Sequence, residues 1–113
     1  MQVVELYLKR QTFTQIRQRM RHSLLSIANY VITFALVVAH TRDGHSVDEI
    51  AFLMQISVGL VRQYQDLYER YNLPEYRERI EEMIATVKAR GFRPSQLEAQ
   101  EQAEAGEKRG QTA

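Results

Sequence analysis

The chain repeats itself with an offset of 34 residues, and this repeat constrains its fold more than any other feature. When the stretch that begins at Val3 is aligned with the stretch that begins at Val37, six pairs of residues are identical. The pairs are Val3 and Val37, Val4 and Val38, Ile16 and Ile50, Met20 and Met54, Ser23 and Ser57, and Tyr30 and Tyr64. The two copies meet in the most apolar run of the chain, residues 23–41. We therefore expect one long central helix that ends the first copy and begins the second.

Hydrophobic spacing and capping residues predict further helices on both sides of this run. Ser46, followed three residues later by Glu49, forms a capping box, and Ser57 is suited to cap the helix expected at residues 58–71. Gly44 is suited to a positive-φ position after the central helix, and Pro74 to the first turn of a last helix at residues 74–91. Residues 92–113 contain almost no large apolar side chains, so we expect a disordered tail.

The second copy meets the packing requirements of a helix-turn-helix unit. Where the two helices must cross, an aliphatic residue is followed by a small residue. An apolar residue closes the turn, and two further apolar residues face inward from the second helix. These residues are Ile50, Ala51, Ile56, Val61 and Tyr64. Gln55 occupies the turn position where glycine is commonest, which implies a strained or differently shaped turn.

The first copy is a degenerate version of the same pattern. Ile16 and Ile27 have the required spacing, but Arg17 stands in the small-residue position and His22 closes the turn. A period of 34 residues also suits tetratricopeptide helical pairs, but the Trp, Gly and Pro typical of that repeat are missing. We therefore expect an all-α fold in which two helix-turn-helix units, residues 1–42 and 24–71, overlap in the central helix.

Two stretches, RMRHSLLSIANYVITFALV and GHSVDEIAFLMQISVGLVRQYQDLY, carry a family resemblance. They resemble the C-terminal part of an uncharacterised prokaryotic family of unknown function. The second unit is also similar to the region-4 helix-turn-helix of sigma factors and to the DNA-binding heads of transposases. The resemblance implies a DNA-binding regulator or a mobile-element protein. Because longer family members carry an additional N-terminal half, it also allows a truncated member without independent function.

Candidate DNA contacts fall into two groups. On the expected recognition helix, the residues left free by the inward positions are Ser57, Gly59, Arg62, Gln63 and Asp66. Arginine pairs with guanine and glutamine with adenine in the major groove. Residues 1–44 carry six Lys and Arg against two acidic residues, so the basic excess lies in the first unit. Its candidate phosphate contacts are Lys9, Arg10, Arg17, Arg19 and Arg21.

Other classes of protein fit the sequence less well. The chain contains no glycine-rich phosphate loop or nucleophile motif, and its three histidines do not share a helix face, so we expect no enzyme, cofactor or metal site. The apolar run contains Ser26, Asn29 and Thr33 and is short for a membrane span, which favours a core helix. The lack of cysteine and of a signal peptide favours a cytoplasmic protein.

A protein-interaction module on the same helical scaffold is the alternative function. Leu25 and Ile32 would then form part of the contact surface, together with the apolar stripe of the last helix. That stripe, which includes Tyr76, Ile80, Met83 and Val87, faces either the helical core of its own chain or a second copy of the chain, because it would otherwise expose a patch large enough to mark an interface. We therefore also expect a homodimer through the helix at residues 74–91.

Overall fold

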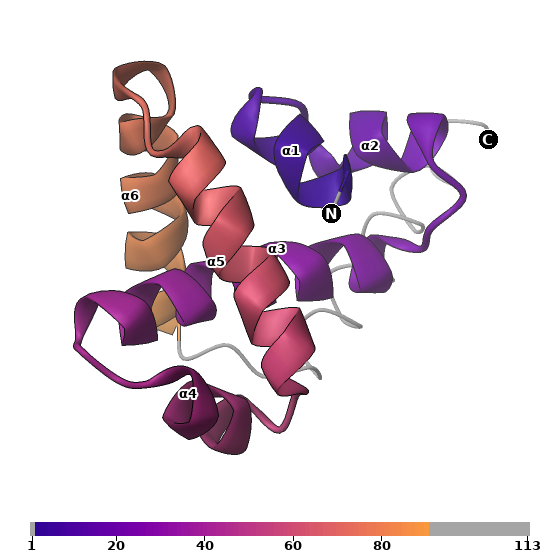
Figure 1. Ribbon diagram of the computed structural model, residues 1–113. Coiled ribbons are helices and arrows are strands. Elements are labelled where there is room, and N and C mark those ends of the chain that lie inside the picture. Colours follow the sequence, from indigo (N-terminus) through magenta and orange to yellow (C-terminus); the bar gives the residue numbers. More distant parts are fainter. Residues whose placement is uncertain (1, 91–113) are drawn as a thin grey trace, which may run out of the picture.

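The structure, a computed structural model, describes residues 2–90, which form six α-helices and no strands (Figure 1). The helices are α1 (Gln2–Leu8), α2 (Phe13–Arg19), α3 (Leu24–Arg42), α4 (Val47–Met54), α5 (Val58–Tyr71) and α6 (Pro74–Arg90). The expected all-α fold is therefore confirmed. The disordered tail expected at residues 92–113 lies outside the described residues.

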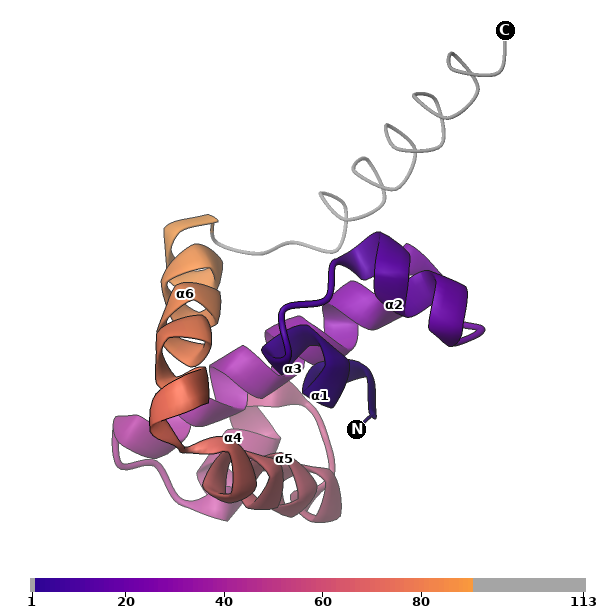
Figure 2. The same ribbon diagram turned by 90° about the horizontal axis from the view of Figure 1, so that it is seen from above.

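Helix α3 is the centre of the fold and contacts each of the other five helices. Figures 1 and 2 show α5 crossing α3 near its middle, α6 crossing its C-terminal half and α2 lying along its N-terminal half. Phe34, Val37 and Val38 are fully buried in the middle of this helix. By length and composition α3 could cross a membrane, but half of it is buried by the other helices of the fold. Its apolar character is accounted for by this packing, as expected for a core helix.

The sequence repeat is visible in the backbone at the end of each leading helix. Arg10 and its counterpart Gly44 both have a positive φ, of 66° and 87°. In each case the next backbone N–H reaches back five residues, from Gln11 to the Leu6 carbonyl and from His45 to the His40 carbonyl, both at 3.2 Å. This is the bonding of a Schellman motif, which satisfies carbonyls that the helix end leaves free.

The equivalent helix starts also match. Thr12 and Ser46 both cap their helices through reciprocal capping boxes, with Gln15 and Glu49 as the third helical residues. Ser23 caps α3, and Ser57 caps α5 in the same way. The two copies therefore use the same local signals in the same order.

The buried side chains form two clusters, a small one within the first copy and a larger one that joins both copies to α6. The smaller cluster joins Val3, Ile16 and Ile27 from α1, α2 and the start of α3. The larger one joins the second half of α3 to α1, α4, α5 and α6, and includes Phe34, Ile50 and Val61. Ile16 and Ile50 are equivalent in the repeat and are both fully buried. The larger cluster is thus built from both copies of the repeat and from α6.

Helix α6 packs on α3 through the apolar stripe on which the dimer prediction rested. Ile80, Met83, Ile84 and Val87 are each at most 7% exposed. Ion pairs flank this contact, from Arg10 to Glu82 at 3.0 Å and from Arg42 to Glu81 at 2.6 Å. The stripe is therefore covered by its own chain. The homodimer remains a prediction, but an exposed stripe on α6 no longer supports it.

Candidate nucleic-acid interface

Helices α4 and α5 are joined by a tight turn whose geometry depends on Gln55. This residue has φ 58° and ψ 42°, in the left-handed region that the sequence predicts for a glycine position. The N–H of Ile56 then donates to the Ala51 carbonyl at 3.1 Å, and the Gln55 side-chain amide donates to the Phe52 carbonyl at 2.8 Å. Ser57 starts α5 by accepting from the Leu60 N–H at 3.1 Å.

Replacing Gln55 by glycine is expected to stabilise the protein by about 0.5–1 kcal/mol. The left-handed conformation costs a non-glycine residue about 1–2 kcal/mol, and glycine avoids this cost. Part of the resulting gain in stability is offset because glycine has more conformational freedom in the unfolded chain. The control is Gln63→Gly on the exposed face of α5, which should destabilise the protein by about 1 kcal/mol. Urea unfolding of both variants measures the difference, and a destabilised Gln55→Gly would contradict the strain.

The inward residues of the turn unit pack as the sequence predicts. Ile50 and Val61 are fully buried, and Tyr64 is 2% exposed. The Tyr64 ring lies 6.4 Å from the ring of Phe34, which ties α5 to the central helix. Because these residues fix the rotation of α5, its opposite face is turned toward solvent.

The five candidate residues of α5 and its cap all lie on this solvent face. Gly59, Arg62, Gln63 and Asp66 are exposed, as is Ser57. Arg62 forms no ion pair within residues 2–90, so its guanidinium is available to a ligand. A Cβ added at Gly59 would meet only the Ser57 hydroxyl, at 4.0 Å, so packing does not require glycine there.

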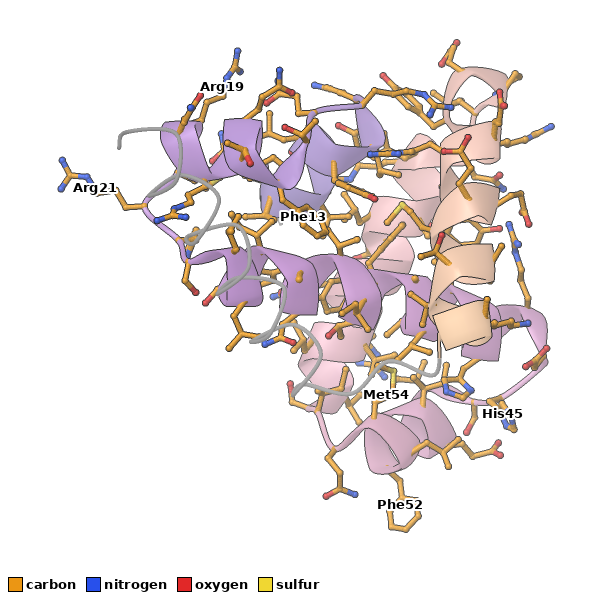
Figure 3. The ribbon with its side chains drawn as sticks, turned by 180° about the vertical axis from the view of Figure 1, so that it is seen from behind. Phe13, Arg19, Arg21, His45, Phe52 and Met54 are labelled. Carbon is orange, nitrogen blue, oxygen red and sulfur yellow. The ribbon has the colours of Figure 1, made fainter. Side chains whose placement is uncertain are left out.

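Helix α4 exposes two large apolar residues that the sequence reasoning did not single out. Phe52 is 75% exposed and Leu53 52% exposed. Figure 3 shows the Phe52 side chain pointing away from the body of the protein. Both residues lie outside the buried stripe of α4. The helical spacing of that stripe in the sequence could have identified them as exposed.

The first turn of α4 is acidic, with Asp48 and Glu49 both exposed. The backbone N–H of Ser46 and the His45 ring bond to the Glu49 carboxylate and lower its pKa. This carboxylate therefore stays ionised near neutral pH and adds negative charge at the edge of the candidate interface.

The arginines of the first unit lie at another part of the surface. Arg17, Arg19 and Arg21 are exposed, and none forms an ion pair in the part of the chain that the structure describes. Figure 3 shows Arg19 and Arg21 pointing outward, at the opposite end of the view from Phe52. These arginines therefore lie apart from the candidate residues of α5 (Figure 3).

The two remaining basic candidates differ from each other. Lys9 is exposed, whereas Arg10 is held by Glu82 through two hydrogen bonds of 3.0 and 3.3 Å. This carboxylate raises the pKa of Arg10. We therefore assign Arg10 to the contact between the α1–α2 connection and α6, and remove it from the phosphate group.

The first unit does not reproduce the turn of the second. Helix α2 ends at Arg19, and Met20 adopts an extended conformation with φ −123° and ψ 137°. No left-handed residue follows α2, whereas Gln55 follows α4. The first copy therefore retains the caps and the core positions of the motif but has lost its turn.

These features define a small all-helical protein built from a duplicated helical unit around one shared helix. The chain belongs to the family described as Protein of unknown function (DUF1670), whose model matches residues 1–67. The match covers both copies of the repeat almost completely and confirms the expected membership of an uncharacterised family. No curated protein and no solved structure matches the chain.

Proposed function

We propose that this protein binds double-stranded DNA through α5 and acts as a transcriptional regulator or as a DNA-binding protein of a mobile element. The observation that carries the proposal is the tight turn between α4 and α5. It combines a left-handed Gln55 with a buried Val61 and leaves Arg62 on the solvent face. In helix-turn-helix proteins this arrangement places the second helix in the major groove.

The chemistry of the exposed face fits base recognition. The Arg62 guanidinium can donate two hydrogen bonds to guanine, and the Gln63 amide can bond to adenine. Asp66 can accept from the amino group of cytosine. The Ser57 hydroxyl oxygen accepts from Leu60, but its hydrogen can still be donated to a phosphate. Gly59 adds no side chain between the backbone and the DNA.

The charge distribution assigns non-specific attraction to the first unit. Residues 45–71 contain two arginines against four acidic residues, Asp48, Glu49, Asp66 and Glu69. This segment alone would be repelled by the phosphate backbone. The exposed arginines of residues 17–21 carry no compensating partner among residues 2–90, so they supply the attraction that α5 lacks.

Replacing Arg62 by alanine tests the proposal. If Arg62 reads guanine, the change should weaken binding to the preferred site by about 1–3 kcal/mol, with a smaller effect on random DNA. Stability should barely change because the side chain is exposed. The preferred site is obtained by selection from a random duplex pool, and affinities are measured by fluorescence anisotropy.

The matched control is Arg77→Ala, which removes an equally charged, exposed side chain from α6. It should reduce affinity for the selected site no more than for random DNA. Equal affinities of the Arg62→Ala variant and the wild type for the selected site would contradict direct reading by α5.

Protein binding is the second candidate, favoured by the exposure of Phe52 and Leu53. The apolar stripe of α6, which first suggested such a function, is buried against α3, so α4 now offers the better contact surface. Phe52→Ser would then abolish binding to the partner and leave DNA affinity unchanged. Loss of DNA affinity in this variant, with the fold intact, would instead place α4 against the DNA.

A further inference from the structure

Three potential metal ligands come together where α3 is connected to α4. His40 lies in the last turn of α3, Asp43 caps the helix end, and His45 follows Gly44. One ligand atom from each of the three side chains lies within 4.8 Å of the others. This group is separate from the proposed DNA contacts of α5, and Figure 3 places His45 in the connecting loop.

The Schellman turn at Gly44 is what unites the two histidines. The backbone N–H of His45 donates to the His40 carbonyl at 3.2 Å, and the two rings lie 5.5 Å apart at an angle of 67°. In such a turn, the second residue after the helix cap packs against the residue five positions earlier. Helical periodicity alone does not pair positions 40 and 45, which is why the sequence pattern predicts no metal site.

The ring of His45 already has a carboxylate partner of the kind that orients metal-binding histidines. Its Nδ1 lies 3.2 Å from a Glu49 carboxylate oxygen. A carboxylate bonded to one ring nitrogen fixes the tautomer, leaves Nε2 as the metal ligand and increases its basicity. Glu49 is itself held by the capping box at Ser46, so the orienting group is fixed by the start of α4.

His40 is half-buried, and its Nδ1 is shielded from solvent without a hydrogen-bond partner among the described residues. A buried polar atom without a partner is uncommon in a folded protein. The ring is therefore not held by a structural hydrogen bond through this nitrogen.

We propose that His40, Asp43 and His45 bind one zinc ion, which joins the end of α3 to the start of α4. Two imidazoles and one carboxylate are a donor set that zinc accepts, with water in the fourth position. Ligand atoms around tetrahedral zinc lie about 3.3 Å apart, given bonds of about 2.0–2.1 Å. The side chains must therefore close by at most about 1.5 Å from their 4.8 Å limit. Asp43 is exposed, so its side chain can rotate, and small shifts of the two rings complete the closure while His45 keeps its bond to Glu49.

Zinc titration of the full chain by calorimetry, with thermal unfolding as a second readout, tests the site. The wild type should bind one zinc ion per chain and unfold at a higher temperature when zinc is present. His45→Gln and Asp43→Asn should each weaken zinc binding at least about 10-fold and remove most of the thermal shift. Circular dichroism without metal verifies that each variant is folded.

Two further variants separate the site from adventitious binding. Glu49→Gln should weaken zinc binding about 10-fold or more, because it removes the orienting carboxylate. The glutamine at position 49 should keep the capping box of α4, because Gln15 is the third residue of α2 and completes the equivalent capping box there. His22→Gln, at a histidine near Tyr30, should bind zinc like the wild type. The proposal is overturned if the wild type does not bind zinc, or if His45→Gln and His22→Gln bind it equally.

Discussion

Replacing Phe34 by alanine is expected to destabilise the protein by about 3–5 kcal/mol. Phe34 is fully buried at the middle of α3, in the core cluster that joins α3 to α1, α4, α5 and α6. Removing its ring leaves a cavity bordered by Tyr64, and the surrounding helices can collapse into it only in part. Since small domains are stable by only about 5–15 kcal/mol, this change should remove a large fraction of the total.

Urea denaturation followed by circular dichroism measures this effect. The control is Leu25→Ala on the same helix, because Leu25 is half-buried and belongs to neither core cluster. The alanine at position 25 should have a much smaller effect than the one at position 34. A Phe34→Ala variant within about 1 kcal/mol of the wild type would mean that α3 is not the central helix of the core.

Replacing Arg17, Arg19 and Arg21 together by glutamine is expected to give the largest loss of DNA affinity. Each phosphate contact contributes about 0.9 to the slope of log K against log salt, so three contacts would lower that slope by up to about 2.7. The loss should be nearly the same for every DNA sequence, because phosphates carry no sequence information. Affinity for random duplex DNA is measured by anisotropy over a range of salt concentrations.

The control for this triple variant is Arg77→Gln combined with Lys88→Gln. Both residues are exposed on α6, so the double variant also removes positive charge without altering the core. It should change the slope much less than the triple variant. If the triple variant keeps the slope of the wild type, the arginines of α2 and its following turn do not contact phosphates.

Local signals made most of the helices predictable from the sequence. Ser46 and Glu49 form the predicted capping box, Gly44 has the predicted positive φ, and α5 spans the predicted residues 58–71. Pro74 begins α6 as its fixed φ favours. These features depend on residues within one helical turn of each other, and such interactions are encoded in short stretches of sequence.

Contacts between distant segments were not predictable in this way. Arg10 lies in the connection between α1 and α2, and only the packing of α6 brings Glu82 to it across 72 residues of sequence. The dimer prediction rested on the apolar stripe of α6, which the sequence allowed to face either the core of its own chain or a second chain, and α3 covers it. A hydrophobic stripe predicts that a surface is buried but does not identify what covers it.

The candidate site was predictable to a similar extent. The inward positions Val61 and Tyr64 determine which face of α5 is exposed, so Arg62 and Gln63 lie where the periodicity places them. The histidine cluster was missed because its geometry comes from a left-handed turn at Gly44 and not from a helix face. Helical periodicity describes side chains within a helix, and it does not describe those joined by a turn.

The affinity of the wild-type protein for random duplex DNA, measured by anisotropy as a function of salt, tests the central claim most directly. A DNA-binding function predicts measurable binding at low salt and a linear fall of log K with log salt, with the three arginines contributing up to about 2.7 to the magnitude of the slope. Absence of binding at low salt, or an affinity independent of salt, would contradict DNA binding.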